Sequence, residues 1–271
     1  MTLYLVSTPI GNLEDVTLRA LRVLSKVDIV ATEDTRVAGR LLAARNLRKV
    51  LKSYYEHNEE HSARELLVHL KAGKDVALVT NAGTPCISDP GYRVVRLAIE
   101  HGIPVVPIPG PTAFVSAVQV SGLPVHRILF LGFPPRKDKH RRDLLVKYAA
   151  VDATLVFYEA PHRIVKLVRD ALGVFGPRPA ALCREMTKKF EEVRRGTLAE
   201  LLQSIESDPP RGEIVLVVGG AGDRKSWAES LGGKEEANRK VGRSRRVNSC
   251  GRSDTCDEKE ISDETGEENV E

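Results

Sequence analysis

Aromatic residues are scarce in this 271-residue sequence, and long apolar runs are missing from it. Phe, Trp and Tyr make up only 5% of the residues, so the core that the 42% hydrophobic content can build is expected to be aliphatic. No apolar run approaches the roughly 20 residues that a membrane helix needs. No basic stretch followed by an apolar one opens the chain, so no secretory leader is predicted. These absences predict a cytoplasmic protein without a membrane segment.

Cysteines and nucleotide-binding signatures are also sparse. The cysteines Cys86, Cys183, Cys250 and Cys256 lack the spacing of metal ligands, and no histidine lies near the last two. Free thiols and no metal site are therefore expected. The sequence contains neither Gly-x-Gly-x-x-Gly nor Gly-x4-Gly-Lys-Ser/Thr. Their absence removes the main evidence for a bound dinucleotide or a P-loop nucleotide.

Charge is distributed unevenly along the chain. Residues 221–271 hold 10 Lys and Arg against 13 Asp and Glu, whereas residues 1–220 hold 31 against 24. The first 220 residues are thus more basic than the whole-chain charge of +4 suggests, which favours a polyanionic partner. The last 51 residues have too little apolar surface to offset the entropy cost of ordering, so this tail is predicted to be disordered.

The most informative segment is a strand, a loop of small residues and a helix over residues 75–101. The apolar run 75–79 predicts a buried strand, and a long loop rich in Asn, Gly, Thr, Pro and Ser follows it up to Gly91. Gly83 permits a ligand to approach the backbone closely, and Pro85 stiffens the loop. The helix that follows is expected to place Tyr92, Val95 and Ile99 on one face. Long ordered loops of this kind are usually functional.

The same succession recurs at four other predicted strand ends. Loops rich in Pro, Gly and Thr or in charged residues follow apolar runs at residues 8–12, 108–113, 132–137 and 159–163. In open α/β sheets, ligands bind outside the carboxyl ends of the strands. Five such loops therefore indicate a binding site assembled from strand ends.

The periodicity of apolar residues predicts an α/β protein with two domains. Strands are expected at 3–7, 28–32, 75–80, 104–107, 128–131, 153–158, 179–185, 190–195 and 213–218, and helices at 16–26, 35–45, 58–72, 91–101, 111–121, 138–150, 161–173 and 197–205. Asp15 is expected to cap the first helix. Gly122 followed closely by Pro124 suggests a junction, so we predict an N-terminal α/β domain over 1–122, a C-terminal α/β domain over 123–220 and the charged tail over 221–271.

Seven segments carry a resemblance to a known family. They are Thr8–Leu13, Glu33–Arg36, Ala82–Pro85, Ser88–Gly91, Pro109–Ala113, Gly132–Phe133 with Pro135–Lys137, and Tyr158–Arg163. In order and in residue type they resemble the rRNA-modifying members of the tetrapyrrole-methylase superfamily, and the similarity spans about residues 3 to 219. One departure is Asn81, which stands where the family usually has Asp.

The resemblance implies a fold, an activity and partners. It implies two α/β domains with S-adenosyl-L-methionine (SAM) in the cleft between them. The implied reaction is 2′-O-methylation of a cytidine ribose in the decoding region of 16S rRNA, on free rRNA or on the small ribosomal subunit. A homodimer is also implied, since the superfamily is commonly dimeric.

Site residues follow from the resemblance and from residue type. The resemblance implies cofactor contacts at Pro9, Gly83, Thr84, Pro85, Ile87, Ser88, Thr112, Ala113, Tyr158, Gly212 and Glu213. Substrate contacts are expected at Arg36, Phe133, Arg136 and Lys137 because cations neutralise phosphates and an aromatic ring can stack on a base. Phe133 is equally compatible with stacking on the adenine of the cofactor.

Several roles stay open at the level of sequence. A base would assist attack by a ribose hydroxyl, and Glu33, Asp34, Lys137 and Glu159 are all candidates. Asp34 and Glu159 are equally compatible with capping of backbone amides, and Arg36 with an internal ion pair. The basic run 136–142 is either an RNA contact or a solvated helix start. Two other functions also remain: methylation of a tetrapyrrole or another small substrate, and RNA binding without catalysis.

Overall fold

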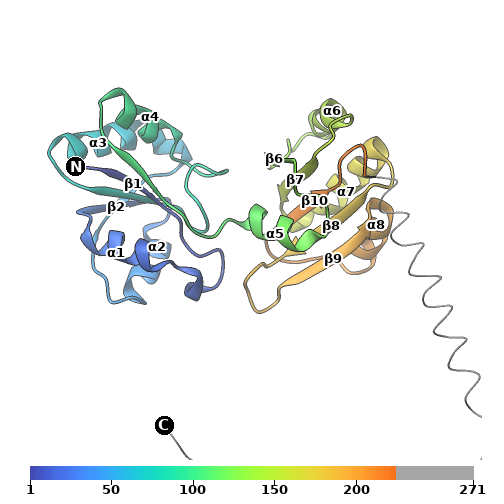
Figure 1. Ribbon diagram of the computed structural model, residues 1–271, viewed down its shortest axis with the longest axis horizontal. Helices are drawn as coiled ribbons and strands as arrows, with labels where there is room; N and C mark the ends of the chain where they lie inside the picture. Colours follow the sequence, from blue (N-terminus) through green and yellow to red (C-terminus); the bar gives the residue numbers. More distant parts are fainter. Residues whose placement is uncertain (224–271) are drawn as a thin grey trace, which may run out of the picture. The chain divides into compact units, whose positions relative to one another are not determined.

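The computed structural model describes residues 1–223, which contain two five-stranded sheets and belong to one compact unit (Figure 1). The predicted α/β class with two sheets is confirmed. The predicted disorder of the tail and the predicted free thiols of Cys250 and Cys256 concern residues outside the described part of the chain. None of the described helices is long and apolar enough to cross a membrane.

The first sheet is entirely parallel, with the strand order β3-β2-β4-β1-β5. Its strands are β1 (Leu3–Val6), β2 (Ile29–Thr32), β3 (Val50–Ser53), β4 (Val76–Val79) and β5 (Val105–Ile108). Because all five strands run the same way, the loops that follow them emerge at the same edge of the sheet.

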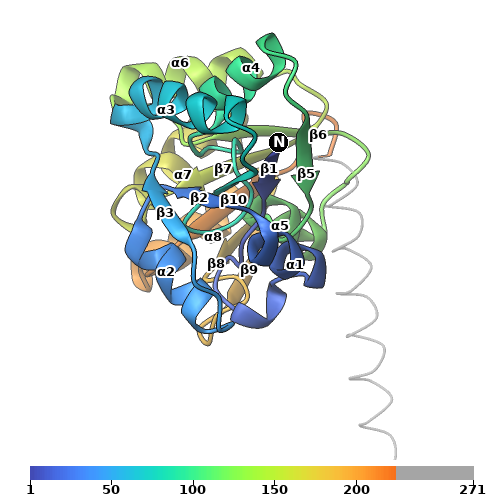
Figure 2. The ribbon, with the colours of Figure 1, turned by 90° about the vertical axis from the view of Figure 1, so that its left-hand side faces the viewer.

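Helices cover both faces of this sheet (Figure 2). They are α1 (Leu18–Lys26) and α2 (Thr35–Ala43) on one face, and α3 (Glu59–Lys71) and α4 (Tyr92–Glu100) on the other. Side chains of β4 alternate between the two cores: Val76 and Leu78 pack with α3 and α4, and Ala77 and Val79 pack with α1 and α2. Burial on both faces explains why the strands read as continuous apolar runs.

The second sheet is mixed, with the strand order β6-β7-β10-β8-β9. Its strands are β6 (Ile128–Gly132), β7 (Thr154–Glu159), β8 (Pro179–Arg184), β9 (Glu192–Thr197) and β10 (Ile214–Val218). Only the β6–β7 pair is parallel. The helices α6 (Asp138–Tyr148), α7 (Pro161–Phe175) and α8 (Leu198–Ser207) contribute to the core on one face.

The other face of the second sheet is covered by α5 (Ala113–Ser121), which follows the last strand of the first sheet. Ala117 and Val118 of this helix pack with Val156, Ala181 and Val215. The chain thus leaves the first sheet before α5 and returns to it no more within the described residues. Gly122 ends α5 with a left-handed φ of 77°, as a helix C-terminus commonly requires. The division into domains at residue 122 stays a prediction.

Three local predictions were wrong. Asp15 does not cap α1: it ends a short 3-10 helix (Leu13–Asp15), and the Thr17 hydroxyl accepts the capping bond from the Ala20 amide at 3.0 Å. The expected apolar face of α4 is largely solvated, with Tyr92 67% and Ile99 65% exposed. Strand β3 was missed because its Val-Leu-Lys-Ser sequence is short and lies at an exposed sheet edge.

Candidate active site

A cavity of about 400 Å³ lies where loops of both sheets meet; we call it the cofactor cavity. The loop after β4, the start of α5, the end of β7 and the start of β10 line it. The lining residues are Ile10, Thr80, Asn81, Ala82, Gly83, Thr84, Ile87, Ser88, Asp89, Thr112, Ala113, Phe133, Tyr158, Glu159, Ala160, Pro161, Met186, Gly212, Glu213, Ile214 and Val215. Its position at strand ends is the one that the loop sequences predict.

The loop after β4 is held in an unusual backbone conformation. Gly83 has a φ of +94° and pairs with Thr8 through two backbone hydrogen bonds, of 2.8 and 3.1 Å. A Cβ at Gly83 would lie 3.4 Å from the Ile10 Cγ2 methyl. Cys86 and Ser88 also have positive φ values, of 69° and 61°. Such strain in non-glycine residues is typical of functional loops.

Hydroxyl groups tie three loops into one wall of the cavity. Thr84 Oγ1 lies 2.9 Å from Ser7 Oγ and 2.7 Å from Thr112 Oγ1. Thr84 also donates to the Pro111 carbonyl at 3.1 Å. The loops after β1, β4 and β5 are therefore fixed relative to one another by a single side chain, that of Thr84.

An aromatic group forms another part of the wall. The Tyr158 hydroxyl accepts a hydrogen bond from the Phe114 amide at 3.1 Å, which connects β7 to the start of α5. Burial raises the pKa of Tyr158 to about 12, so the hydroxyl stays protonated. Phe133 lies 5.5 Å from the Tyr158 ring, centroid to centroid, and is itself exposed. An exposed ring beside a cavity is available for stacking on a planar ligand.

Three carboxylates line the cavity, and no Lys or Arg is among its lining residues. Burial raises the pKa of Asp89 to about 6; a contact with the Thr80 hydroxyl opposes the shift, and the negative charge of Glu33 adds to it. Burial also raises the pKa of Glu159, which is 2% exposed. A cavity with this lining favours a cationic ligand and disfavours phosphate groups.

Glu159, the last residue of β7, is held by groups at the start of the following helix, α7. Its Oε1 accepts a hydrogen bond from the Ala160 amide at 2.8 Å. Its Oε2 lies 3.1 Å from Arg163 Nη2, close enough for an ion pair but without hydrogen-bond geometry, and it has no hydrogen-bond partner among the described residues. Glu159 thus accepts from one backbone amide, as expected, although α7 has no side-chain cap, and its Oε2 is buried beside Arg163.

Most of the residues expected to bind the cofactor line this cavity. They are Gly83, Thr84, Ile87, Ser88, Thr112, Ala113, Tyr158, Gly212 and Glu213. Pro9 instead lines a neighbouring hollow, and Pro85 is buried behind the loop. Their role as cofactor ligands stays a prediction.

A second hollow, of about 370 Å³, adjoins the first; we call it the adjoining hollow. It shares Ile10, Thr80, Asn81, Ala82 and Glu213 with the cofactor cavity. Apolar side chains of Leu13, Val37 and Leu41 line the rest, together with the basic Arg40 and Lys188. An apolar floor with cations at its edge suits a nucleotide.

Asn81 connects the two spaces to a carboxylate. Its Oδ1 accepts a hydrogen bond from the Asp34 amide at 3.2 Å, and its Nδ2 donates to Glu33 Oε2 at 2.9 Å. An Asp at this position would bring a second negative charge against Glu33 and lose the donor. Asn81, which lines both spaces, therefore fixes one carboxylate oxygen of Glu33, although Glu33 itself lines neither.

Asp34 and Arg36 are occupied with each other. Asp34 caps α2 by accepting from the Arg36 amide at 2.8 Å, and its Oδ2 lies 2.8 Å from Arg36 Nη2. The hydrogen bond from the Arg36 side chain lowers the pKa of Asp34 to about 2. The predicted cap and ion pair are both confirmed. Arg36 nevertheless projects into solvent, 86% exposed.

The basic run 136–142 divides into free and paired residues. Arg136 and Lys137 are exposed and line neither the cofactor cavity nor the adjoining hollow. Arg141 is buried, 3% exposed, and its Nη2 lies 2.6 Å from Asp170 Oδ2. Arg142 pairs with the same carboxylate at 2.8 Å. The run is thus not one continuous contact for RNA, because Arg141 is a structural ion-pair partner.

Asp89 is the lining residue that the sequence prediction most clearly missed. It directly follows Ser88, which was predicted, in a Ser-Asp-Pro-Gly loop after a strand. Its place in this loop could have identified it as a lining residue. Met186 was missed for a different reason: it lies in a turn after β8, with no motif around it. Within residues 1–223 no group of three His, Cys, Asp or Glu side chains is placed to hold a metal ion.

The family follows from comparison with known proteins. The profile of the tetrapyrrole (corrin/porphyrin) methylases matches residues 2–202. The chain belongs to this family.

More particular relatives are ribosomal RNA small subunit methyltransferases I. The chain is 47% identical to the one of Halalkalibacterium halodurans (strain C-125), over 85% of the chain and 81% of the relative. It is 51% identical to the one of Mesorhizobium japonicum, over 81% of the chain and 75% of the relative.

Solved structures support the fold. The chain matches the cobalt precorrin-4 methyltransferase CbiF with a TM-score of 0.61 and 18% identity, over 81% of the chain and 95% of that protein. It matches a Thermus thermophilus uroporphyrin-III C-methyltransferase, solved in complex with S-adenyl homocysteine, with a TM-score of 0.58 and 24% identity, over 82% and 98%.

Proposed function

We propose that the protein transfers the methyl group of SAM to the 2′-oxygen of a cytidine ribose in the decoding region of 16S rRNA. The observation that carries the proposal is a cavity lined by three carboxylates without Lys or Arg, built from the family's loops and adjoined by a nucleotide-sized hollow. The high identity to ribosomal RNA small subunit methyltransferases I supports rRNA as the substrate.

The lining of the cofactor cavity fits SAM. SAM supplies an electrophilic methyl group on a positively charged sulfur. Asp89 and Glu213 offer negative charge for the cationic groups, and Ile87 and Phe133 offer apolar surface for the adenine. The start of α5, at Thr112 and Ala113, presents backbone amides that suit a carboxylate.

The adjoining hollow is proposed to receive the cytidine nucleotide. Leu13, Val37 and Leu41 would contact the base, and Arg40 would lie near phosphate oxygens. Lys188 is paired with Glu185 at 2.9 Å and with Glu213 at 3.2 Å, so Arg40 is the cation proposed for the phosphate. Since this hollow shares five residues with the cofactor cavity, a ribose in it can approach the methyl group. Holding the two reactants in line supplies much of the rate acceleration for such a displacement.

Among the base candidates, the contacts favour Glu33. Asp34 is committed to Arg36 and has a pKa of about 2, so it accepts a proton poorly. Lys137 lines neither space, and Glu159 is bonded to the Ala160 amide and paired with Arg163. Glu33 also lines neither space, but it is hydrogen-bonded to Asn81, which lines both. From this position it would receive the proton of the ribose hydroxyl as the oxygen–methyl bond forms.

The proposal is tested by methyl transfer with tritiated SAM. Small ribosomal subunits that lack the modification are incubated with the protein, and the labelled nucleotide is mapped by nuclease digestion. Alkaline hydrolysis then locates the methyl group, because a 2′-O-methyl group blocks cleavage of the adjacent linkage. Label on a base, or on a tetrapyrrole but not on rRNA, would overturn the proposal.

We propose two further properties. The family resemblance supports a cytoplasmic homodimer, and sedimentation equilibrium of the purified chain tests the dimer. The predicted junction at Gly122 and Pro124 supports a division of the domains at residue 122. Separate expression of residues 1–122 and 123–220 tests this division, which requires each piece to fold although the second is then without α5, the helix that packs on its sheet.

A further inference from the structure

A third hollow, of about 480 Å³, lies at one end of the second sheet; we call it the arginine hollow. It is lined by Pro161, His162, Arg184, Arg194, Asp208, Pro209, Pro210 and Arg211. Three guanidinium groups and one imidazole thus face a single carboxylate. None of these residues is part of the cofactor cavity or the adjoining hollow except Pro161, which also lines the cofactor cavity.

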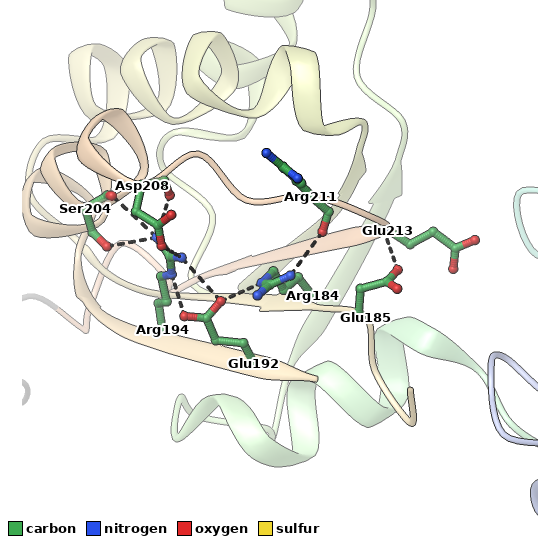
Figure 3. A network of polar contacts seen from close by, with 8 residues as sticks. All are labelled: Arg184, Glu185, Glu192, Arg194, Ser204, Asp208, Arg211 and Glu213. Carbon is green, nitrogen blue, oxygen red and sulfur yellow. Dashed lines mark hydrogen bonds and ion pairs between the residues drawn. The ribbon is translucent and has the colours of Figure 1, made fainter. Parts of the chain in front are cut away.

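One of the three arginines is structural. Arg194 Nε donates to Glu192 Oε1 at 2.8 Å, and its Nη1 donates to the Asp208 carbonyl at 2.9 Å. Its Nη2 lies 2.5 Å from Asp208 Oδ2. Arg194 thereby balances the charge of Asp208 and braces the segment that leads to Arg211 (Figure 3).

The other two arginines retain free donors. Arg184 Nε is held 2.5 Å from Glu192 Oε2 and its Nη1 makes a long contact of 3.5 Å with the Arg211 carbonyl, but its Nη2 has no partner among the described residues. The Arg211 side chain points away from this network, is exposed, and has no partner in the described part of the chain (Figure 3). Arg184 is thus pre-oriented while Arg211 is available, a combination that suits bidentate binding of an anion.

The start of α7 places a further donor at the hollow. His162 lies in the first turn of this 15-residue helix and is exposed. The carboxylate of Glu159 already lies at the positive end of this helix, where it accepts from the Ala160 amide at 2.8 Å. The attraction of the arginine hollow for an anion therefore comes from its side chains, Arg184, Arg211 and His162, and not from the helix dipole.

The hollow lies beside the proposed reaction site. Ile214 of β10 pairs with Glu159 on one side and with Arg184 on the other. Neighbouring strands are roughly 4.8 Å apart, so the backbones of Glu159, at the cofactor cavity, and Arg184, at the arginine hollow, are separated by about 10 Å. Gly212 and Glu213, which follow Arg211 directly, also line the cofactor cavity.

We infer that the arginine hollow binds a backbone phosphate of the RNA substrate, near the nucleotide that is methylated, with Arg184, Arg211 and His162 as its donors. The inference rests on the proposed function. We assign the phosphate to the RNA backbone and not to a free ion. An RNA strand bound through it would extend from the arginine hollow toward the adjoining hollow. An RNA strand held at this point and at the adjoining hollow would have its ribose fixed between two contacts.

The test uses the full chain and the variants Arg211→Ala and Arg211→Ala/His162→Ala. Both side chains are exposed, and His162 has only an electrostatic interaction with Glu159, so the variants should fold. The matched control is Arg19→Ala on α1, an exposed arginine that lines neither the arginine hollow, the cofactor cavity nor the adjoining hollow. Binding of a fluorescent RNA with the decoding-region sequence is measured by anisotropy over a series of salt concentrations.

Arg211→Ala should weaken RNA binding about fivefold to tenfold at low salt and reduce the salt slope by about one, since one phosphate contact is lost. The double variant should lose more, and Arg19→Ala should stay within about twofold of the wild type. SAM affinity, measured by calorimetry, should be unchanged in all three. In methyl transfer, KM for small subunits should rise while kcat changes by less than about twofold.

An unchanged salt slope in Arg211→Ala, or an equal loss in Arg19→Ala, would overturn the inference. So would a fall in SAM affinity, which would assign Arg211 to the cofactor cavity. The proposed function fails separately, if the wild-type protein methylates no rRNA. If the wild-type protein methylates rRNA and Arg211→Ala keeps the wild-type salt slope and KM, the phosphate site in the arginine hollow is refuted while the proposed function stands.

Discussion

The cofactor cavity and the arginine hollow share Pro161 and differ in charge. One is lined by Asp89, Glu159 and Glu213, the other by three arginines and a single aspartate. The two lie on opposite sides of Ile214 at one rung of the sheet. The contrast teaches that a single sheet end can serve two ligands of opposite charge, provided that their side chains are kept apart by an apolar strand. It also predicts that substitutions in one site leave the ligand of the other unaffected.

The contrast assumes that only arginines without a buried partner are available to RNA. Arg141 should then contribute to the stability of the fold through its pair with Asp170. Asp170→Ala should lower the free energy of unfolding by about 3 to 5 kcal/mol, because the buried Arg141 then loses its buried carboxylate and keeps only the exposed Asp138 as an ion-pair partner. Urea denaturation measures the loss. Glu206→Ala, which removes the exposed partner of Arg169, is the control and should cost at most about 1 kcal/mol. If Asp170→Ala and Glu206→Ala lower the free energy of unfolding equally, the Arg141–Asp170 pair contributes no more than a surface ion pair.

Gly83→Val tests the cofactor side of the contrast. The substitution forces a β-branched residue into a φ of +94° and places a Cβ 3.4 Å from Ile10. SAM affinity should fall about a hundredfold, close to 2.7 kcal/mol. Gly73→Val is the matched control, since Gly73 has a φ of +86° with no atom within 4 Å of its Cβ position. Calorimetry should find weakened SAM binding in Gly83→Val and not in Gly73→Val. Unchanged SAM affinity in a folded Gly83→Val protein would show that the cofactor does not bind at this loop.

Asp89→Asn removes one of the acids that define the cofactor cavity. SAM affinity should fall about tenfold, or 1.4 kcal/mol, because a cation loses a nearby charge. The same change should stabilise the fold at pH 7.5. The carboxyl has a pKa of about 6 when folded against 3.8 as its ordinary value, so the folded state binds the proton more tightly. Stability of the wild type therefore falls as the pH rises from about 4 through 6.

The gain in Asp89→Asn should be about 1 kcal/mol at pH 7.5, since solvent screening reduces the full effect of a two-unit shift. It should vanish below about pH 4, where the wild-type carboxyl is protonated in both states. Thermal melts of the two proteins over this pH range measure the difference. A constant gap at every pH would show that Asp89 does not titrate in this window.

Arg136→Ala/Lys137→Ala should have the smallest effect. Both side chains are exposed and line none of the described cavities, so each contributes at most one screened phosphate contact. RNA affinity should fall about threefold to tenfold, the salt slope should drop by one to two, and SAM affinity should stay within about twofold. Anisotropy and calorimetry check the two ligands. The control is the double variant Arg19→Ala/Arg22→Ala, which changes two exposed arginines on α1. An equal effect in the control would show that both pairs act only through the overall charge of the protein.

Much of the fold could be predicted because the buried strands are apolar on both faces. Val76–Val79 reads as a strand at once, whereas β3, with Lys52 at an exposed edge, does not. The face of α4 was misjudged because Tyr92 and Ile99 are large, although the buried positions are Val94 and the small Ala98. Size is a poor guide where a helix packs closely on its neighbour.

The amino-acid sequence by itself determined where the strands end and which small residues follow them, since Gly83 and Thr84 are selected by local backbone geometry and close packing. Only the tertiary structure decided which charges are free. Arg141 is neutralised by Asp170, 29 residues away, while Arg211 has no partner in the described residues. Asn81 likewise meets Glu33 across 48 residues. The availability of a charged side chain depends on partners that the fold brings close, and these cannot be read from its neighbours in the chain.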